Sequence, residues 1–340
     1  MLTDETLLSC QIRDALLAPL AQASAILLAV SGGPDSTALL KLAADWRAAD
    51  PSRPRIFAAS VDHGLRAEAR AEVEAVAELA QTLGVPHAIL TWEGEKPRSA
   101  LQEKARAARY GLLVAHARAI GADSLCTAHH ADDQAETVLM RMARGSGIAG
   151  LAGMRPIKVL DGLRLLRPLL DIPKSGLVAF CHVQGLPFAQ DASNVDDRFA
   201  RARVRKLAGA LAREGLSAAR FTELARRAAR ADDALVSMAQ TVTNKVCTRS
   251  ATGARVDLAA LLNEPEDIGL RVLAGQVANL SAIPLRLHRL ESAFARLAQA
   301  CAQRESLKLS LGGALLQLNA AGELRLCAEP ARRRGRAESM

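Results

Sequence analysis

The feature that most constrains the fold is an alternation of short apolar runs and longer amphipathic segments over the first 130 residues. The strand candidates are nearly continuous apolar runs, at 25–30, 56–61, 87–91 and 124–127. Helical periodicity fills the gaps between them, at 37–48, 68–83 and 100–119. Apolar strands that alternate with helices are typical of a parallel sheet covered on both faces. The sequence therefore predicts an α/β fold for this part of the chain.

Three polar segments follow these strands, and we expect them to meet. They are SGGPDS at 31–36, DHGLR at 62–66 and AHHADD at 128–133. The carboxyl ends of parallel strands lie at one edge of a sheet, where open α/β sheets bind their ligands. The sequence therefore predicts one ligand site built from loops that are far apart along the chain.

A chain of 340 residues is longer than one hydrophobic core usually supports, so we expect two domains. The parallel-sheet, helix-covered catalytic domain is expected over 1–214. A second, mainly helical domain that ends in short strands is expected over 215–330. The basic tail at 331–340 is expected to be disordered.

Composition narrows the class of protein. The six cysteines include no C-x-x-C pair, which argues against a zinc ribbon or a cysteine-held cluster. The acidic start MLTDETLLSC lacks the charge of a signal peptide, and no apolar run approaches the roughly 20 residues of a membrane helix. We therefore expect a cytoplasmic protein with no membrane contact. The net charge of +8 is compatible with nucleic acid as a partner but does not demonstrate one.

The segment SGGPDS has the properties of an anion-binding loop. Two glycines between a strand and a helix let backbone N–H groups face one concavity, and the helix N-terminus adds partial positive charge. Ser31 and Ser36 add hydroxyl donors, and the lysine of a Walker loop is missing. Asp35 would repel a bare phosphate, so a cation such as Mg²⁺ is expected between them. An ordinary capped strand-to-helix turn is the alternative.

SGGPDS resembles the PP-loop, S-G-G-x-D-S, of the N-type ATP pyrophosphatases, which hold the pyrophosphate end of ATP and transfer AMP to a substrate oxygen. Further stretches follow in order: VDHGLR, KARAARY, AHHADDQAETVLMRMARGSG and DASNVDDRFARARVR. Together they resemble the tRNA(Ile)-lysidine synthetase family over about 24–210. One departure is Ala202, which stands where the family usually has Asn within R-N-x-x-R.

The resemblance implies an ATP-dependent ligase that joins L-lysine to C2 of the wobble cytidine of a tRNA(Ile) with a CAU anticodon. Lysidine would form through an adenylated cytidine, with release of AMP and pyrophosphate. Adenylation is needed because the C2 oxygen of cytosine is a poor leaving group. The lysine amine, with a pKa of about 10.4, must also lose a proton, and nearby carboxylates could assist.

The resemblance also implies roles for individual residues. The expected catalytic residues are Asp35, Asp133, Glu136, Arg109 and Arg205. The expected ATP-binding residues are Ser31, Gly32, Gly33, Pro34, Asp35, Ser36, Asp62 and His63. The expected tRNA-binding residues are Arg66, Arg201, Arg203 and Arg205. Mg²⁺ is expected on Asp35 and Asp133, whereas Asp132 is expected to cap the helix.

Each of these assignments has a structural alternative. Asp133 and Glu136 could be a solvated first turn that complements the helix dipole, or could form a zinc site with His129 and His130. The helix with Arg106, Arg109 and Tyr110 could be an ordinary surface helix. The segment 201–230, with nine Lys or Arg against two Asp or Glu, could be a solvated face rather than a phosphate-binding one.

Alternatives to the ligase also stay open at this stage. A tRNA thiolase shares the HHADDQAET-like helix, although many thiolases use cysteine pairs or clusters. A non-catalytic tRNA- or nucleotide-binding module would not require the carboxylates. A small-molecule amidotransferase would need a glutaminase region, which the sequence does not show. The oligomeric state is open, and a homodimer is one of its outcomes.

Overall fold

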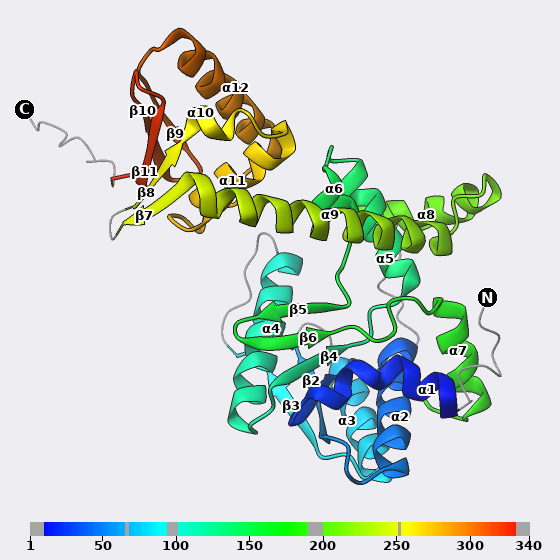
Figure 1. Cartoon of the computed structure of the whole chain (residues 1–340). Coiled ribbons are helices and arrows are strands. Elements are labelled where there is room, and N and C mark those ends of the chain that lie inside the picture. The colour runs from blue at the N-terminus through cyan, green and yellow to red at the C-terminus, as the bar shows by residue number, and fades with distance from the viewer. Residues whose placement is uncertain (1–9, 65–67, 94–100, 190–199, 251–252, 331–340) are drawn as a thin grey trace, which may run out of the picture. The chain divides into compact units, whose positions relative to one another are not determined.

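The computed structural model describes residues 10–64, 68–93, 101–189, 200–250 and 253–330 (Figure 1). The chain divides into two compact units, the first formed by 1–145 with 150–227 and the second by 146–149 with 228–340. The division falls inside helix α9 (Ala218–Val246), whereas the sequence predicted the end of the first domain at residue 214. The reason is that Phe221 and Ala225, on the first turns of α9, are buried in one cluster with α5 (Ala131–Met142). The predicted disordered tail at 331–340 lies outside the described residues.

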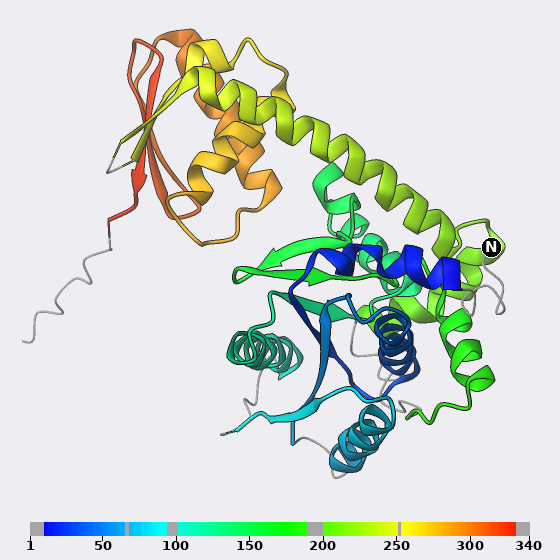
Figure 2. The same cartoon turned by 60° about the horizontal axis from the view of Figure 1, so that its bottom comes forward.

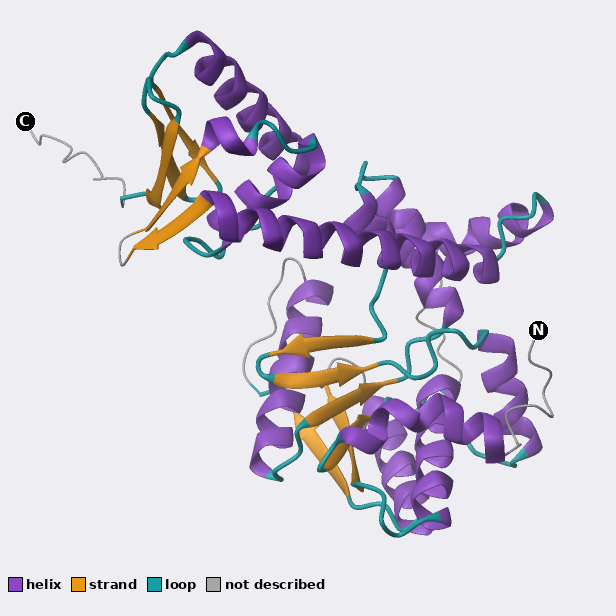
Figure 3. Ribbon diagram, viewed as in Figure 1, coloured by secondary structure: helices purple, strands orange, loops and turns teal. Residues whose placement is uncertain are grey.

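The first unit is built on a six-stranded sheet with the strand order β3-β2-β1-β4-β6-β5 (Figures 1 and 3). All neighbouring strands are parallel except the edge pair β5 and β6. The strands are β1 (Ala25–Ala29), β2 (Arg55–Asp62), β3 (His87–Thr91), β4 (Ser124–Thr127), β5 (Ile157–Leu160) and β6 (Leu163–Leu166). The predicted α/β fold with a mainly parallel sheet is confirmed.

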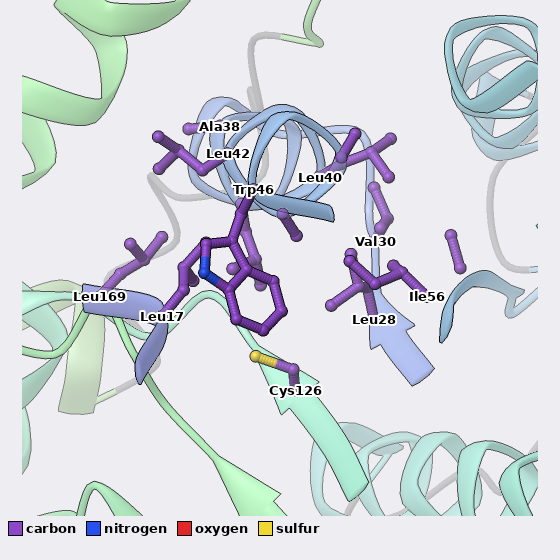
Figure 4. Packing of buried hydrophobic residues seen from close by; sticks show 14 of the residues in the cluster. Leu17, Leu28, Val30, Ala38, Leu40, Leu42, Trp46, Ile56, Cys126 and Leu169 are labelled. Atoms are coloured by element: carbon purple, nitrogen blue, oxygen red, sulfur yellow. The ribbon is translucent and has the colours of Figure 1, made fainter. Parts of the chain in front are cut away.

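Helices cover both faces of this sheet (Figure 2). On one face lie α2 (Pro34–Ala49) and α3 (Glu68–Thr82), and on the other lies α4 (Leu101–Ala119). The other helices of this unit are α1 (Cys10–Leu17), the 3₁₀ turn η2 (Ala18–Gln22), α5, α7 (Lys174–Val183) and α8 (Ala200–Arg213). Because side chains alternate along a strand, Ile26 and Leu28 of β1 join the core beneath α2 and α7, while Leu27 joins the core beneath α4. Figure 4 shows Trp46 of α2 beside Leu17 and Cys126 in the first of these cores.

The strand order places the ligand site. The central strand β1 lies between β2 and β4: the chain runs outward from β1 to β2 and β3, and then crosses back to β4 on the other side of β1. Such a topological switch opens a crevice outside the carboxyl ends of the strands. The segment 31–36 follows β1 directly and therefore lies at this crevice.

The hairpin of β5 and β6 was not predicted from the sequence, which indicated only turns after Gly153. Both strands have four residues, too few for a clear alternation of apolar side chains. Asp161 and Gly162 join them with φ of 47° and 83°, the left-handed conformations of a tight two-residue hairpin turn. The Asp-Gly pair was thus the available signal for a hairpin.

The second unit has a five-stranded antiparallel sheet, in the order β7-β8-β11-β10-β9, with helices on one face (Figure 3). The strands are β7 (Cys247–Ser250), β8 (Gly253–Asp257), β9 (Leu307–Leu311), β10 (Ala314–Leu318) and β11 (Glu323–Ala328). Its helices are the rest of α9, α10 (Leu258–Leu261), α11 (Glu266–Ala278) and α12 (Leu287–Gln303); a single turn, α6 (Ile148–Leu151), begins within it. The helical region and terminal strands are confirmed, whereas β7 and β8 were not predicted.

Among the described residues, no helix combines the length and the apolar character that crossing a membrane requires.

Candidate active site

The loop after β1 is held in a fixed conformation by its own side chains. Ser36 Oγ donates to the carbonyl of Gly33 at 3.0 Å and accepts from the N–H of Ser31 at 3.1 Å. Gly32 has φ of +84°, a conformation that other residues rarely adopt, and its carbonyl accepts from Ala189 N–H. Pro34 is the first residue of α2, where the missing N–H costs no helical hydrogen bond. The loop therefore presents the N-terminus of α2 to the crevice, which suits an anion.

Asp35 and Asp133 come together at this crevice, although they are far apart in the sequence. Asp35 is in the first turn of α2 and Asp133 in the first turn of α5. His130 Nε2 lies 3.5 Å from Asp35 Oδ2 and 3.4 Å from Asp133 Oδ2, so one imidazole joins the two carboxylates. Asp35 Oδ1 is buried and has no hydrogen-bond partner in the described part of the chain, which leaves it available for a ligand.

His130 is almost completely buried among carboxylates. Burial alone would favour its neutral form, but hydrogen bonds and charge from Asp132, Asp35 and Asp133 outweigh burial and raise its pKa to about 9. Its Nδ1 lies 3.4 Å from the N–H of Asp133 and 3.6 Å from Asp132 Oδ2. At pH 7 the ring is therefore an imidazolium, and its Nδ1–H is directed to the carboxylate of Asp132 rather than accepting from the N–H of Asp133.

The predicted cap of α5 was wrong. His130, not Asp132, is the N-cap residue, and its backbone N–H donates to Asp133 Oδ2 at 3.3 Å. Asp132 instead accepts from the backbone N–H of Lys174 at 2.8 Å, at the start of α7. A cap precedes the first helical residue, and Asp132 is already the second residue of α5.

Glu136 lies one turn further along α5 and is only 5% exposed. Arg201 Nε donates to Glu136 Oε2 at 2.9 Å, and Arg205 Nε donates to Glu136 Oε1 at 2.7 Å. Arg201 also lies 3.7 Å from Asp133 Oδ1. Because the two arginines are four residues apart, they lie on the same face of α8, and each donates to one oxygen of the same carboxylate. These three residues hold α8 against α5.

A cavity of about 440 Å³ opens beside the loop and is lined by five of the eight predicted ATP-binding residues and three of the five predicted catalytic residues. Apolar side chains from the ends of β1 and β2 and from α4 line one part of it, including Ala29, Ala59, Val61 and Leu113. The polar lining residues include Ser31, Asp35, Ser36, His63, Arg106, Arg109, Tyr110, Thr127, His129 and Asp133. A site with an apolar slot and a charged end suits a nucleotide.

Arginine and histidine side chains also line this cavity. Arg109 Nε donates to His63 Nε2 at 3.4 Å. Desolvation by the surrounding protein, together with the positive charge of Arg106, lowers the pKa of Arg109. His129 Nδ1 lies 2.9 Å from Thr127 Oγ1. Burial, opposed by Asp133 and aided by nearby arginines, lowers the pKa of His129 to about 4. His129 is therefore neutral at pH 7.

Some predicted residues lie outside this cavity. Asp62 accepts from the N–H of Gly64 at 2.8 Å and so closes the turn after β2 rather than lining the cavity. Arg203 is exposed on α8, on the side away from Arg201 and Arg205. Arg66 lies outside the described residues.

A second cavity, of about 220 Å³, lies between α5, α8 and the start of α9. Its wall is apolar and formed by Ala135, Leu139, Val204, Ala208, Leu211, Leu216, Ala218 and Phe221. Its charged residues are His130, Asp132, Glu136, Lys174 and Arg205. The first turns of α5 thus contribute Asp133 to the first cavity and Glu136 to the second.

The residues present suit Mg²⁺ better than zinc. Among the described residues, no group of three His, Cys, Asp or Glu side chains could hold a metal by itself. Mg²⁺ needs only one or two carboxylates when substrate phosphates and water complete its shell. Asp35, with its unpartnered buried oxygen, and Asp133 provide those carboxylates.

Two residues near the site were missed by the sequence reasoning. Gln134 is buried in α5 and makes two hydrogen bonds to the backbone of Met154, which fix the segment before β5. Arg167 is buried directly after β6, and its Nη1 donates to the carbonyl of Arg155 at 2.7 Å. A charged residue inside the apolar stretch LRLLRPLL was the signal for Arg167.

Comparison with known proteins agrees with this geometry. Residues 7–211 match the family model described as PP-loop domain. A tRNA(Ile)-lysidine synthase from Methylobacterium sp. (strain 4-46) is 52% identical over 319 residues, 92% of this chain and 91% of that protein. The tRNA(Ile)-lysidine synthase from Bradyrhizobium sp. (strain BTAi1 / ATCC BAA-1182) is 42% identical over 349 residues, 97% of each chain.

A solved structure shares the fold at low identity. It is the U34-tRNA thiolase NcsA from Methanococcus maripaludis with its [4Fe-4S] cluster. The match has a TM-score of 0.56 and 17% identity, and covers 66% of this chain and 80% of that one. This likeness supports the fold alone. The extent and identity of the matches to the lysidine synthases show more: the chain belongs to the tRNA(Ile)-lysidine synthase family, and its N-terminal part is a PP-loop domain.

Proposed function

We propose that this protein ligates L-lysine to C2 of the wobble cytidine of tRNA(Ile) with a CAU anticodon, using ATP. The observation that carries the proposal is the convergence of the loop 31–36, Asp35 and Asp133 on one cavity with an apolar slot. Binding alone would not require two carboxylates beside a phosphate loop. The family relationship supplies the substrates.

ATP binds in the first cavity. The N-terminus of α2 and the hydroxyl of Ser31 receive the pyrophosphate end, and the apolar slot with Ala59, Val61 and Leu113 receives the adenine. Gly32, Gly33 and Ser36 keep the loop in the conformation that permits this approach. Asp35 and Asp133 would hold Mg²⁺. When bound, the ion neutralises phosphate charge and polarises the phosphoryl oxygens.

The carboxylates of α5 receive the lysine amine. Asp133 lines the first cavity and Glu136 the second, whose apolar wall and charged rim suit an amino acid with a long methylene chain. A carboxylate attracts the ammonium form and can take its proton before the amine attacks C2. Attack breaks the bond between C2 and the oxygen of AMP, and AMP leaves with that electron pair.

Cysteine chemistry is disfavoured at this site. Burial raises the pKa of the Cys126 thiol strongly, and burial with the charge of Asp35 raises that of Cys181 to about 11. A thiol that stays protonated is a poor nucleophile. The ligase is therefore better supported than a thiolase, whose product would contain sulfur.

The tRNA contacts the exposed side of α8. Because Arg201 and Arg205 donate to Glu136, we assign them to holding α8 and the lysine site. We assign a phosphate contact to Arg203 because its side chain is exposed on α8. We also propose that Arg66 contacts the tRNA, as the resemblance implies, and that Asp62 serves the ATP site through the turn after β2 that it closes. We further propose a cytoplasmic location and, to be tested by sedimentation, a homodimer.

We expect Arg203→Gln to weaken tRNA binding without weakening ATP binding. Loss of one phosphate contact should lower the slope of log affinity against log salt by about one unit. Fluorescence titration of tRNA between low and moderate salt measures this slope. Arg118→Gln is the matched control, because Arg118 is exposed at the far end of α4, where it donates to the carbonyl of Asp161. An unchanged slope in Arg203→Gln would remove Arg203 from the interface.

The activity itself is tested by incubating the full chain with ATP, labelled lysine and tRNA(Ile), followed by mass analysis of the nucleosides. Incorporation of lysine into a cytidine is the expected result. A sulfur-containing nucleoside, or ATP binding without any lysine in the tRNA, would overturn the proposal.

A further inference from the structure

Helix α4 lines the first cavity with one continuous face. Its four cavity residues are Arg106, Arg109, Tyr110 and Leu113. Their spacing of three, one and three residues places them on the same side of the helix. Leu113 is buried in the core beneath α4, whereas the side chain of Arg106 is exposed. The face therefore changes from apolar to cationic over seven residues, about 10 Å along the helix axis.

The side chain of Arg106 is oriented by Tyr110, one turn further along the helix. Its guanidinium carbon lies 5.1 Å from the centroid of the Tyr110 ring, within the range of a cation–π contact. The ring itself packs against the core beneath α4. A ring that is fixed in this way restricts the guanidinium to the wall of the cavity.

The charge of Arg106 is not compensated by the protein. The carboxylates of Asp35, Glu72 and Asp133 also line the cavity, but within the described ranges no carboxylate forms an ion pair with Arg106 or Arg109. The two arginines are three residues apart, where like charges on a helix repel each other. Positive charge that costs stability in the free protein and faces a cavity favours an anionic ligand there.

We propose that Arg106 contacts a substrate phosphate group other than the pyrophosphate that the loop 31–36 receives. The loop already provides the N-terminus of α2 and the hydroxyl of Ser31 for one anion, and Arg106 belongs to a separate helix. This inference rests on the proposed function for the identity of the substrates. The phosphate is either the α-phosphate of ATP or a phosphate of the tRNA strand that enters the cavity, and separate binding measurements distinguish the two.

An ordinary surface arginine is the alternative, and Lys104 provides the matched control. Lys104 is an exposed cation on the same helix, two residues away, and does not line the cavity. Residues two apart on a helix do not share a face. Arg106→Met removes the charge at similar length, Arg106→Lys keeps the charge, and Lys104→Met removes an equal charge from another face of α4.

Three ligands are titrated separately: ATP with Mg²⁺ but without tRNA, tRNA(Ile) without ATP, and inorganic pyrophosphate with Mg²⁺. We expect Arg106→Met to lose about tenfold in affinity for ATP, for tRNA or for both, and to bind pyrophosphate like the parent. Arg106→Lys should stay within about threefold of the parent and Lys104→Met within about twofold. A loss with ATP alone assigns the contact to the α-phosphate, a loss with tRNA alone assigns it to the RNA strand, and a loss with both places it where the two substrates meet.

Parent-like binding of ATP and of tRNA by Arg106→Met would overturn the proposal. An equal loss in Lys104→Met, a loss in Arg106→Lys as large as in Arg106→Met, or an equal loss with pyrophosphate would overturn it as well. The unfolding temperature of Arg106→Met should stay within a few degrees of the parent, because the side chain is exposed and its repulsion from Arg109 is relieved.

Should Arg106→Met not fold, Arg106→Gln carries the same expectation, because it also removes the charge and keeps a polar end. A parent chain that binds ATP and tRNA without incorporating lysine would refute the proposed function and leave this comparison valid.

Discussion

Asp35→Ala is expected to reduce pyrophosphate release by about 10²–10³-fold while the protein stays folded. Asp35 contributes a buried oxygen that has no hydrogen-bond partner in the described structure, so its removal breaks no internal hydrogen bond of that atom. The other oxygen faces His130 at 3.5 Å, an interaction that Asp133 and Asp132 also provide. The expected loss comes from the missing ligand for Mg²⁺ and its phosphates, where single groups contribute about 10²–10³ to rate.

The measurement is release of labelled pyrophosphate in the presence of tRNA and lysine, together with thermal unfolding of each variant. Asp123→Ala is the matched control. Asp123 accepts from the N–H and hydroxyl of Ser24 and from Ser124 Oγ, at the amino end of β4 and away from the cavity. We expect this control to lower the unfolding temperature and to keep turnover. A folded Asp35→Ala protein with parent-like pyrophosphate release would remove Asp35 from the phosphate site.

The parts of the fold that the sequence predicted are those with a strong local signal. The runs that became β1, β2 and β4 are largely buried and apolar because helices cover both faces of the sheet there, so their composition alone marks them. The edge strand β3 is only half-buried but kept an apolar run. Strand β5 lacks this signal because it has only four residues and its side chains are mostly exposed, including Val159. Strand β8 alternates correctly but is only five residues long, and what defines it is pairing with the distant strand β11.

The site shows the same division between local and distant information. The loop 31–36 and the helix start at His130 carry their chemistry in adjacent residues, so the sequence placed Asp35 and Asp133 in one cavity. The pairing of Glu136 with Arg201 and Arg205 depends on how α8 packs on α5, about 65 residues away along the chain. Spacing along the chain contains no information on such contacts.

The pairing of Glu136 sharpens the expectation for the second half-reaction. We expect Glu136→Gln to form adenylated tRNA at a near-parent rate but to transfer lysine about 10²-fold more slowly. The amide keeps the size but loses the charge that attracts an ammonium and orders the two arginines of α8. Trapping adenylated tRNA with labelled ATP, first without and then with lysine, separates the two steps. Raising the pH toward 9 should partly restore transfer, because more of the lysine amine is already deprotonated.

Glu223→Gln is the matched control, since Glu223 also lies between two arginines, Arg220 and Arg227, but on an exposed face of α9. Exposed salt bridges of this kind contribute little to stability, so this variant should fold and transfer lysine like the parent. If Glu136 acted only by holding α8, Arg201→Gln would slow transfer equally, combination with Glu136→Gln would add nothing, and raised pH would restore neither. That pattern would assign Glu136 to positioning. If raised pH restored lysine transfer in Glu136→Gln but not in Arg201→Gln, the Glu136 carboxylate of the parent would be placed at the lysine amine. If Glu136→Gln failed to form adenylated tRNA despite normal ATP affinity, the separation of the two steps would be refuted.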